Sequence, residues 1–252
     1  MRLLVHEVKG QLRLYTRSRE LAFFTFALPM VFFVLLGSTY GNDRIKSEGG
    51  ARGANFLQAG MIGYGLISIA FAGLAIILVI RRENGILKRL RGTPVPAWTY
   101  VTALLSAFVA AFAVQVAGLL VLGRVLFGIG FPNHFASLVL ALILGAVAFC
   151  GLGIGLASFI HTEEGASAVV NAVYLPATFI AGAFFSAHNF PKVLQAIADV
   201  LPLTYFLRLI RNVMLHDQAI WSQGTNLAVV AVWGVLGVVV ALRAFRWEPH
   251  EG

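Results

Sequence analysis

Long apolar runs alternate with short polar segments along this chain, and the lengths of the runs predict membrane-spanning helices. A helix rises about 1.5 Å per residue, so about 20 apolar residues cross the hydrocarbon core of a bilayer. Six runs lie close to or above that length, at residues 21–40, 56–80, 98–127, 135–160, 166–185 and 225–242. We therefore expect an all-α integral membrane protein, with six transmembrane helices in a single domain over residues 1–252.

Two further segments predict helices that do not cross the membrane. Residues 1–19 place apolar residues on one helical face and basic residues on the other, which is typical of an amphipathic interfacial helix in the headgroup plane. A frayed basic tail is the alternative there. Residues 186–223 contain two apolar-faced stretches, 191–201 and 205–215, with Pro202 between them. Stretches of about eleven residues are too short to span, so we expect an outer segment of re-entrant or interfacial helices.

The composition supports a membrane protein and argues against nucleic-acid binding. Of the 252 residues, 59% are hydrophobic and only 12% are charged, too few to cover a soluble domain. The net charge of +8 comes from Lys and Arg at the ends of apolar runs, the pattern that orients membrane helices. Segments 1–20, 81–96 and 243–252 hold twelve of them, against three in each of 41–55 and 186–223. We expect a multi-pass protein of the bacterial cytoplasmic membrane, contacting lipid, with both termini cytoplasmic.

The segment 81–96 is the only strongly charged block between two apolar runs. Its apolar residues recur at helical spacing, and Gly92 and Pro94 end the pattern because proline cannot extend the hydrogen-bond ladder of a helix. The apolar positions are Ile86, Leu87 and Leu90, and the basic surround is Arg82, Lys88, Arg89 and Arg91. The pattern predicts a short amphipathic helix outside the membrane. An ordinary basic loop that only sets orientation is the alternative.

Polar residues inside the predicted spans are few. Asn171 lies in an apolar stretch, Tyr174 follows about one turn later, and Pro176 removes one helical hydrogen bond. An amide in lipid needs a partner or a water-lined cavity, so this group predicts either a cavity-facing kink or a helix–helix hydrogen bond. Arg124, near the outer end of the third span, is interpreted as a headgroup anchor rather than a transport residue. Candidate residues for a substrate path are Phe71, Asn171, Tyr174, Phe179 and Phe184.

The sequence offers no catalytic or metal-binding constellation. Cys150 is the only cysteine, so an internal disulfide is excluded, and the six histidines are not spaced as metal ligands. The run Gly-Leu-Gly-Ile-Gly at 151–155 lies inside an apolar helix and indicates close helix packing rather than a nucleotide loop. A Gly-x-x-x-x-Gly-Lys-Ser/Thr motif is absent from the chain. We expect that the chain is not an enzyme and carries no metal or cofactor of its own.

Two motifs resemble a known family. The run Arg-Glu-Asn-Gly-Ile-Leu-Lys-Arg-Leu-Arg-Gly-Thr-Pro at 82–94 resembles the cytoplasmic loop after the second span in permeases of the type-2 ABC exporter superfamily. A second resemblance lies in His-Thr-Glu-Glu-Gly at 161–165 and Leu-Pro-Leu-Thr-Tyr at 201–205. Together with the six predicted spans, the likeness covers nearly the whole chain.

The resemblance implies a separate motor. In that family the loop at 81–96 is a coupling helix that meets an ATPase subunit, and the turn at 161–165 is the second contact. The implied coupling residues are Glu83, Gly85, Leu87, Lys88, Arg89, Leu90, Arg91, Thr93, Pro94, Glu163 and Glu164. A solvated turn is the alternative for either of the last two. Two copies of the ATPase would bind ATP and Mg, and a second permease chain, identical or a paralogue, would complete the pathway.

The expected function is therefore that of a permease subunit in an ATP-driven exporter. An apolar, aromatic pathway suits a hydrophobic or amphipathic cargo, and the family includes exporters of drugs, antibiotics and lipids, with roles in multidrug efflux and antibiotic resistance. The alternatives are an ion-driven secondary transporter and a non-transporting docking or immunity protein. No Asp, Glu, Lys or His lies in the middle of a span, which argues against proton coupling, whereas sodium coupling through backbone carbonyls stays open.

Overall fold

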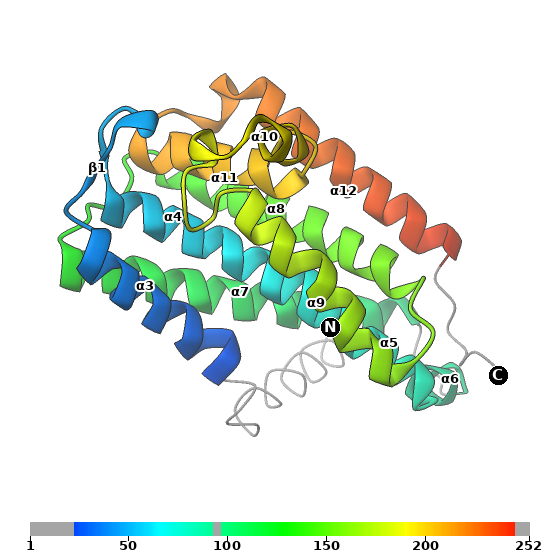
Figure 1. The fold of residues 1–252 in the computed structure, drawn as a ribbon. Coiled ribbons are helices and arrows are strands. Elements are labelled where there is room, and N and C mark those ends of the chain that lie inside the picture. The colour runs from blue at the N-terminus through cyan, green and yellow to red at the C-terminus, as the bar shows by residue number, and fades with distance from the viewer. Residues whose placement is uncertain (1–22, 93–96, 245–252) are drawn as a thin grey trace.

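The computed structural model describes residues 23–92 and 97–244, and helices make up most of both parts (Figure 1). The interfacial helix predicted over 1–19 lies outside these residues, as do Thr93 and Pro94 of the predicted coupling segment. The α-helices are α3 (Leu28–Tyr40), α4 (Gly53–Leu66), α5 (Leu74–Glu83), α6 (Ile86–Arg91), α7 (Ala97–Phe127), α8 (Phe135–Ala157), α9 (Glu163–Ile180), α10 (Lys192–Ala198), α11 (Pro202–Leu215) and α12 (Gly224–Ala244).

Shorter elements complete the fold. Two π-helical stretches, η1 (Phe23–Ala27) and η3 (Ile67–Gly73), continue directly into α3 and α5, and the 3-10 turns are η2 (Lys46–Glu48), η4 (Ala187–Asn189) and η5 (Ile220–Ser222). Strands β1 (Arg44–Ile45) and β2 (Ala51–Arg52) pair antiparallel, with Arg44 opposite Arg52. We call the end of the molecule with this pair the hairpin end, and the opposite end, which carries α6, the α6 end (Figure 1).

The structure is that of an all-α membrane protein. Among the described residues, four helical stretches are long and apolar enough to cross a bilayer: Gly53–Glu83, Thr99–Phe127, Phe135–Ala157 and Gly224–Ala244. The bent pair α10–α11 makes a fifth if it counts as one span. The segment Thr25–Tyr40 is a shorter apolar helix. The count of six spans therefore stays a prediction.

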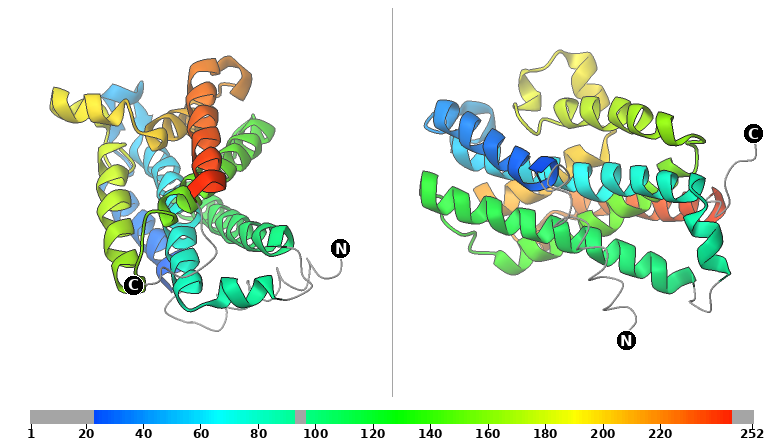
Figure 2. Two further views of the ribbon diagram at one scale, coloured as in Figure 1. Left: turned by 90° about the vertical axis from the view of Figure 1, so that its right-hand side faces the viewer. Right: turned by 90° about the horizontal axis from the view of Figure 1, so that it is seen from below.

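The second predicted span is the centre of the bundle. In an 18-residue apolar window of the column α4–η3–α5, 72% of the residues are buried inside the protein, against 17% in the corresponding window of α12. Helices α3, α7, α8, α9 and α11 pack around this column, and α12 packs on the outside against α8 and α11 (Figure 2). A helix that is apolar on all sides belongs in such a central place.

The segment between α9 and α12 differs in one detail from the prediction. Pro202 was expected to separate two helices as a break, but it is the first residue of α11, where its missing N–H costs no helical hydrogen bond. The break lies at residues 199–201 instead, and α10 and α11 meet there at an angle of 83°. Helix α10 projects from the bundle, whereas α11 packs against α4, α8 and α12 (Figure 2).

Candidate functional site

The predicted coupling segment consists of the end of α5, a tight turn and α6. Gly85 has a φ of +67°, a conformation that glycine adopts without steric cost, and its N–H donates to the Arg82 carbonyl at 2.9 Å. The turn lets α6 leave the direction of α5 and run across the end of the bundle (Figure 1). Leu87 is fully buried, whereas Ile86, Lys88 and Arg89 are exposed. Leu87 thus anchors the helix, and Lys88 and Arg89 present positive charge to the outside.

Arg82 corrects part of the prediction. It was placed in the basic surround of α6, but it belongs to α5 and is buried. Its Nε donates to Glu83 Oε1 at 2.7 Å, its Nη1 donates to the Ala157 carbonyl at 3.1 Å, and its Nη2 donates to the Ile160 carbonyl. The last carbonyls of a helix have no partner within that helix, so the guanidinium of Arg82 satisfies the end of α8. This is why the arginine turns inward.

The turn at 161–165 is shorter than predicted because α9 begins at Glu163. Thr162 is its N-cap, and its Oγ1 accepts a hydrogen bond from the Gly165 N–H at 3.1 Å. Glu163 and Glu164 therefore occupy the first helical turn, where a carboxylate is favoured by the helix dipole. Asn84 Nδ2 donates to Glu163 Oε2 at 2.9 Å and to the Ile80 carbonyl at 3.0 Å.

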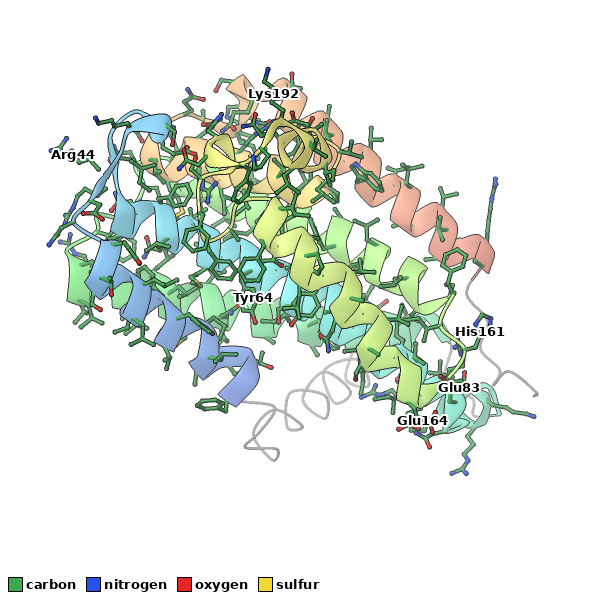
Figure 3. The ribbon with its side chains drawn as sticks, viewed as in Figure 1. Arg44, Tyr64, Glu83, His161, Glu164 and Lys192 are labelled. Atoms are coloured by element: carbon green, nitrogen blue, oxygen red, sulfur yellow. The ribbon has the colours of Figure 1, made fainter. Side chains whose placement is uncertain are left out.

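These contacts join the two predicted coupling segments into one unit. Arg82 ties α5 to the end of α8, and Asn84 ties the turn before α6 to the start of α9. Arg81 adds a link to α7, since its Nη1 donates to Tyr100 Oη at 2.6 Å. Figure 3 shows Glu83, His161 and Glu164 close to α6, with Arg44 at the opposite end. These hydrogen bonds therefore connect the end of α5 and the turn before α6 to α7, α8 and α9.

Removal of the N-cap of α9 is expected to loosen this unit locally. Thr162→Ala deletes the oxygen that accepts from Gly165, at a cost of about 1 kcal/mol in the stability of the first turn. Hydrogen–deuterium exchange of the amides in residues 163–167 should become about fivefold faster. Thr162→Ser keeps the oxygen and should exchange as the wild type does; equal exchange in Thr162→Ala would contradict the cap.

The candidate path residues do not form one group. Phe179 and Phe184 stack at 5.0 Å between ring centroids, Phe184 lies 5.8 Å from Tyr64 of α4, and Tyr174 also interacts with Tyr64. Figure 3 shows Tyr64 in the middle of the molecule, behind α9. Phe71 is buried in the core of the bundle, where its backbone meets Gly153 of α8. Asn171 lies on the exposed face of α9.

The exposed face of α9 is mostly apolar. Val169, Val173, Leu175 and Phe179 are each at least 40% exposed, and Asn171 shares the exposed side. Among the described residues no three His, Cys, Asp or Glu side chains gather as metal ligands. The described residues thus offer an apolar surface on α9 and, at the α6 end, hydrogen bonds that connect neighbouring helices.

Three contributors to the linkage were not foreseen from the sequence. Asn84 was part of the quoted motif but was given no role, Thr162 was not recognised as a cap, and Arg82 was placed on the surface. A signal existed for Thr162, because Thr followed directly by Glu-Glu is typical of a helix start. No local signal could reveal the contacts of Arg82 with Ala157 and of Asn84 with Glu163, since these partners lie more than 70 residues away along the chain.

Comparisons with known proteins agree with this architecture. The profile of the family described as ABC-2 type transporter matches residues 3–215. The chain is similar to the inner membrane transport permease YadH of Escherichia coli strain K12, with 27% identity over 221 residues, which cover 86% of this chain and 82% of that protein. The YadH of Shigella flexneri matches to the same extent. The chain therefore belongs to the ABC-2 type transporter family.

Proposed function

We propose that this chain is the permease subunit of an ATP-driven exporter, powered by two copies of a separate ATPase that binds ATP and Mg. The observation that carries the proposal is the linkage at the α6 end. An exposed cationic helix is fixed to the ends of α5, α8 and α9 through Arg82, Asn84 and Glu163. Such a helix suits a partner that pushes on it from outside the membrane.

The proposed orientation places the α6 end and both termini in the cytoplasm, with six helices across the membrane. Its support is the distribution of charge, because the segments assigned to the cytoplasm hold twelve Lys and Arg, against six in the two segments assigned to the outside. The shorter helix Thr25–Tyr40 and the 18-residue α9 are the two further spans in this arrangement.

In the proposed mechanism the ATPase subunits close on ATP and displace α6 together with the start of α9. The central column α4–η3–α5 then moves relative to the surrounding helices, and the pathway changes the side that it faces. Such a switch needs two packings of similar free energy, with ATP binding biasing one of them. The ABC-2 family assignment and the burial of the column support this route.

A second permease chain, identical or a paralogue, completes the proposed pathway. The apolar exposed face of α9 and the aromatic group of Tyr174, Phe179 and Phe184 suit a lining for hydrophobic or amphipathic cargo. A drug, an antibiotic or a lipid has that chemistry. Efflux of such cargo across the cytoplasmic membrane is the proposed physiological role.

The docking surface is tested by reversing its charge. Leu87→Asp is unsuitable, because Leu87 is buried and an aspartate there would disturb the permease itself. Lys88→Glu with Arg89→Glu changes only exposed side chains of α6. In a pull-down from native membranes, this double variant should recover the partner ATPase about tenfold less well than the wild type. Far-UV circular dichroism and thermal unfolding should be unchanged.

The matched control carries the same charge change at the other end. Lys46→Glu with Lys192→Glu alters two exposed lysines remote from α6 and should recover the ATPase as the wild type does. Equal recovery by the α6 double variant would reject α6 as the docking surface. If the wild type recovers no protein that hydrolyses ATP, the exporter itself is rejected, and an ion-driven transporter or a docking protein takes its place.

A further inference from the structure

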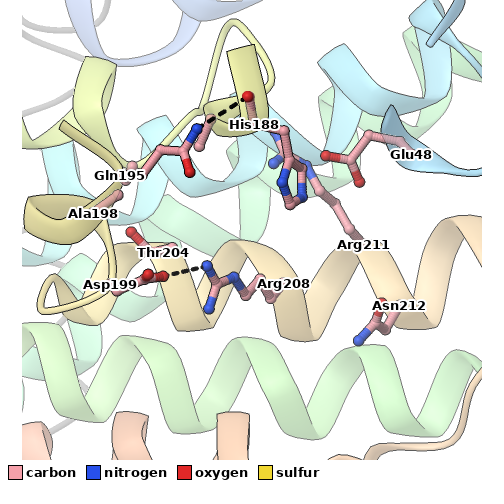
Figure 4. Close-up of a pocket in the computed structure, with 11 residues that line it drawn as sticks. Glu48, His188, Gln195, Ala198, Asp199, Thr204, Arg208, Arg211 and Asn212 are labelled. Atoms are coloured by element: carbon pink, nitrogen blue, oxygen red, sulfur yellow. Dashed lines mark hydrogen bonds and ion pairs between the residues drawn. The ribbon is translucent and has the colours of Figure 1, made fainter. Parts of the chain in front are cut away.

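A polar pocket lies at the hairpin end, remote from α6. Its walls come from η2, from residues 181–190, and from α10 and α11, and its empty volume is about 680 Å³, part of it open to solvent (Figure 4). The side chains that the argument uses are Glu48, Asp199, Thr204, Arg208 and Arg211. None of them is needed for the linkage at the α6 end.

Arg211 is a buried cation with unused donor capacity. Its side chain is only 6% exposed, its Nη2 donates to the Gly182 carbonyl at 2.6 Å, and its guanidinium carbon lies 3.7 Å from the centroid of the Phe56 ring. Within the described residues its Nε has no hydrogen-bond partner, and neither does Oγ1 of Thr204, which is 2% exposed and lines the same pocket. Buried polar groups of native proteins are rarely left without partners, so these two atoms point to a ligand.

Of the two arginines and two carboxylates in the pocket, only one of each forms an ion pair. Arg208 Nη2 and Asp199 Oδ1 make an ion pair at 2.5 Å, which accounts for one charge of each sign. Arg211 and Glu48 are left over, and among the described residues no ion pair within 4.0 Å joins them. Glu48 is held by a hydroxyl chain, since Ser47 Oγ donates to Ser186 Oγ at 3.0 Å and Ser186 Oγ donates to Glu48 Oε1 at 3.3 Å. Figure 4 shows Glu48 and Arg211 on the same side of the pocket.

A second, mainly apolar pocket is linked to the polar one through Phe56, whose ring contacts Arg211. Its apolar lining includes Leu36, Leu57, Phe184 and Phe185, its polar lining includes Asp43, Ser186 and Asn189, and its empty volume is about 720 Å³, again partly open. Phe56 lines this second pocket and also carries the guanidinium of Arg211. A molecule with a charged head and an apolar tail could therefore occupy both pockets at once, with the head beside Arg211.

We propose that the two pockets bind a phospholipid whose headgroup carries a phosphate and an ammonium, with the phosphate at Arg211 and Thr204 and the ammonium at Glu48. The planar guanidinium donates to phosphate oxygens with good geometry, and a carboxylate accepts from an ammonium. The first segment of an acyl chain packs against Leu36, Leu57 and Phe185. This site does not depend on the exporter function, because binding requires neither the ATPase nor transport.

The test uses the full chain in detergent and short-chain lipids as probes. Binding of phosphatidylethanolamine and phosphatidylglycerol is titrated by native mass spectrometry for the wild type, Glu48→Gln and Arg211→Lys. The wild type should bind the ethanolamine lipid about tenfold more tightly than the glycerol lipid, and Glu48→Gln should lose that preference while still binding both. Arg211→Lys, which keeps the charge but loses the planar fork, should weaken both lipids.

Three results would overturn the proposal. The first is an unchanged preference in Glu48→Gln. The second is unchanged lipid binding in Arg211→Lys. The control is Lys192→Gln, which changes an exposed charge at the same end and should bind both lipids as the wild type does. The third is equally tight binding of phosphoethanolamine without acyl chains, which would assign the site to a free phosphate–ammonium compound rather than a lipid. Since the ATPase is absent from this assay, failure here leaves the pull-down result at α6 unaffected.

Discussion

Arg82→Ala is expected to cause one of the two largest losses of stability among single substitutions in this protein. The guanidinium is fully buried and serves three partners: the Glu83 carboxylate and the carbonyls of Ala157 and Ile160. Alanine removes the donors and leaves carbonyl groups at the end of α8 without hydrogen-bond partners. It also deletes the ion pair with Glu83, in which the Arg82 side chain is 1% exposed and the Glu83 side chain 16% exposed. Loss of one partner from a buried charged network costs about 3–5 kcal/mol.

The measurement is thermal unfolding in detergent, followed by tryptophan fluorescence and by size-exclusion chromatography after heating. Arg82→Ala should unfold well below the wild type. Arg82→Lys keeps the charge but not the planar fork, so it should fall between them. The matched control is Arg89→Ala, which removes an exposed arginine of α6 and should change stability by no more than about 0.5 kcal/mol.

The same substitution separates a structural role from a role in coupling. At a temperature where Arg82→Ala is still folded, the ends of α5 and α8 are no longer tied together, so α6 moves without its neighbours. ATPase binding should then persist, since Lys88 and Arg89 are unchanged, while stimulation of ATP hydrolysis by the permease should fall. If Arg82→Ala unfolds with the wild type and stimulates the ATPase normally, the linkage has no mechanical importance.

Hydropathy along the chain predicts the long helices but not how their side chains meet. The long apolar helices were predicted because the length of an apolar run is a local property that the bilayer converts into structure. The inward orientation of the Arg82 side chain was not predicted, because it depends on which face of α5 meets α8. Charge at the end of a span predicts orientation, but not whether a given arginine reaches water or caps a neighbouring helix.

Two buried glutamines illustrate the same limit inside the membrane. The side-chain amide of Gln58 in α4 packs against Gly123 of α7. The side-chain amide of Gln115 in α7 packs in the same way against Gly65 of α4, so each fills the space next to a glycine of the other helix. Gln58 Nε2 also donates to the Leu119 carbonyl at 2.9 Å. The sequence does not predict this exchange of side chains between two antiparallel helices, because it depends on their relative register.

The polar pocket could not have been predicted either. Glu48 and Arg211 lie 163 positions apart in the sequence and meet only because the 41–53 segment, the end of α9 and α11 converge at the hairpin end. In the sequence, Arg211 was one of three basic residues in a segment assigned to the outside. Arg211 is buried against the Phe56 ring only because the fold brings α11 next to α4.

Gly60→Ala is the second substitution with a large expected effect. A Cβ at this position would lie 1.7 Å from the Ala183 carbonyl oxygen and 2.8 Å from its carbon, both backbone atoms that no rotamer change can move. The segment behind Ala183 must therefore shift away from α4. Overpacking of a tight core costs about 1–3 kcal/mol, and a clash with backbone belongs at or above the upper end of that range.

Glycine-to-alanine substitutions at two further positions, one on α4 and one on α12, allow this loss of stability to be compared. A Cβ at Gly63 would lie 2.4 Å from the tip of the Leu207 side chain, which can rotate, so Gly63→Ala should lose less stability than Gly60→Ala. At Gly224 no atom lies within 4 Å, and Gly224→Ala should be nearly neutral. The expected order of thermal stability, from most to least stable, is Gly224→Ala, then Gly63→Ala, then Gly60→Ala; a different order would mean that α4 and residue 183 are not in contact as described.

The carbonyl of Gly182, next to Ala183, accepts the hydrogen bond of Arg211. Gly60→Ala should therefore also weaken lipid binding at the hairpin end, whereas Gly63→Ala should not.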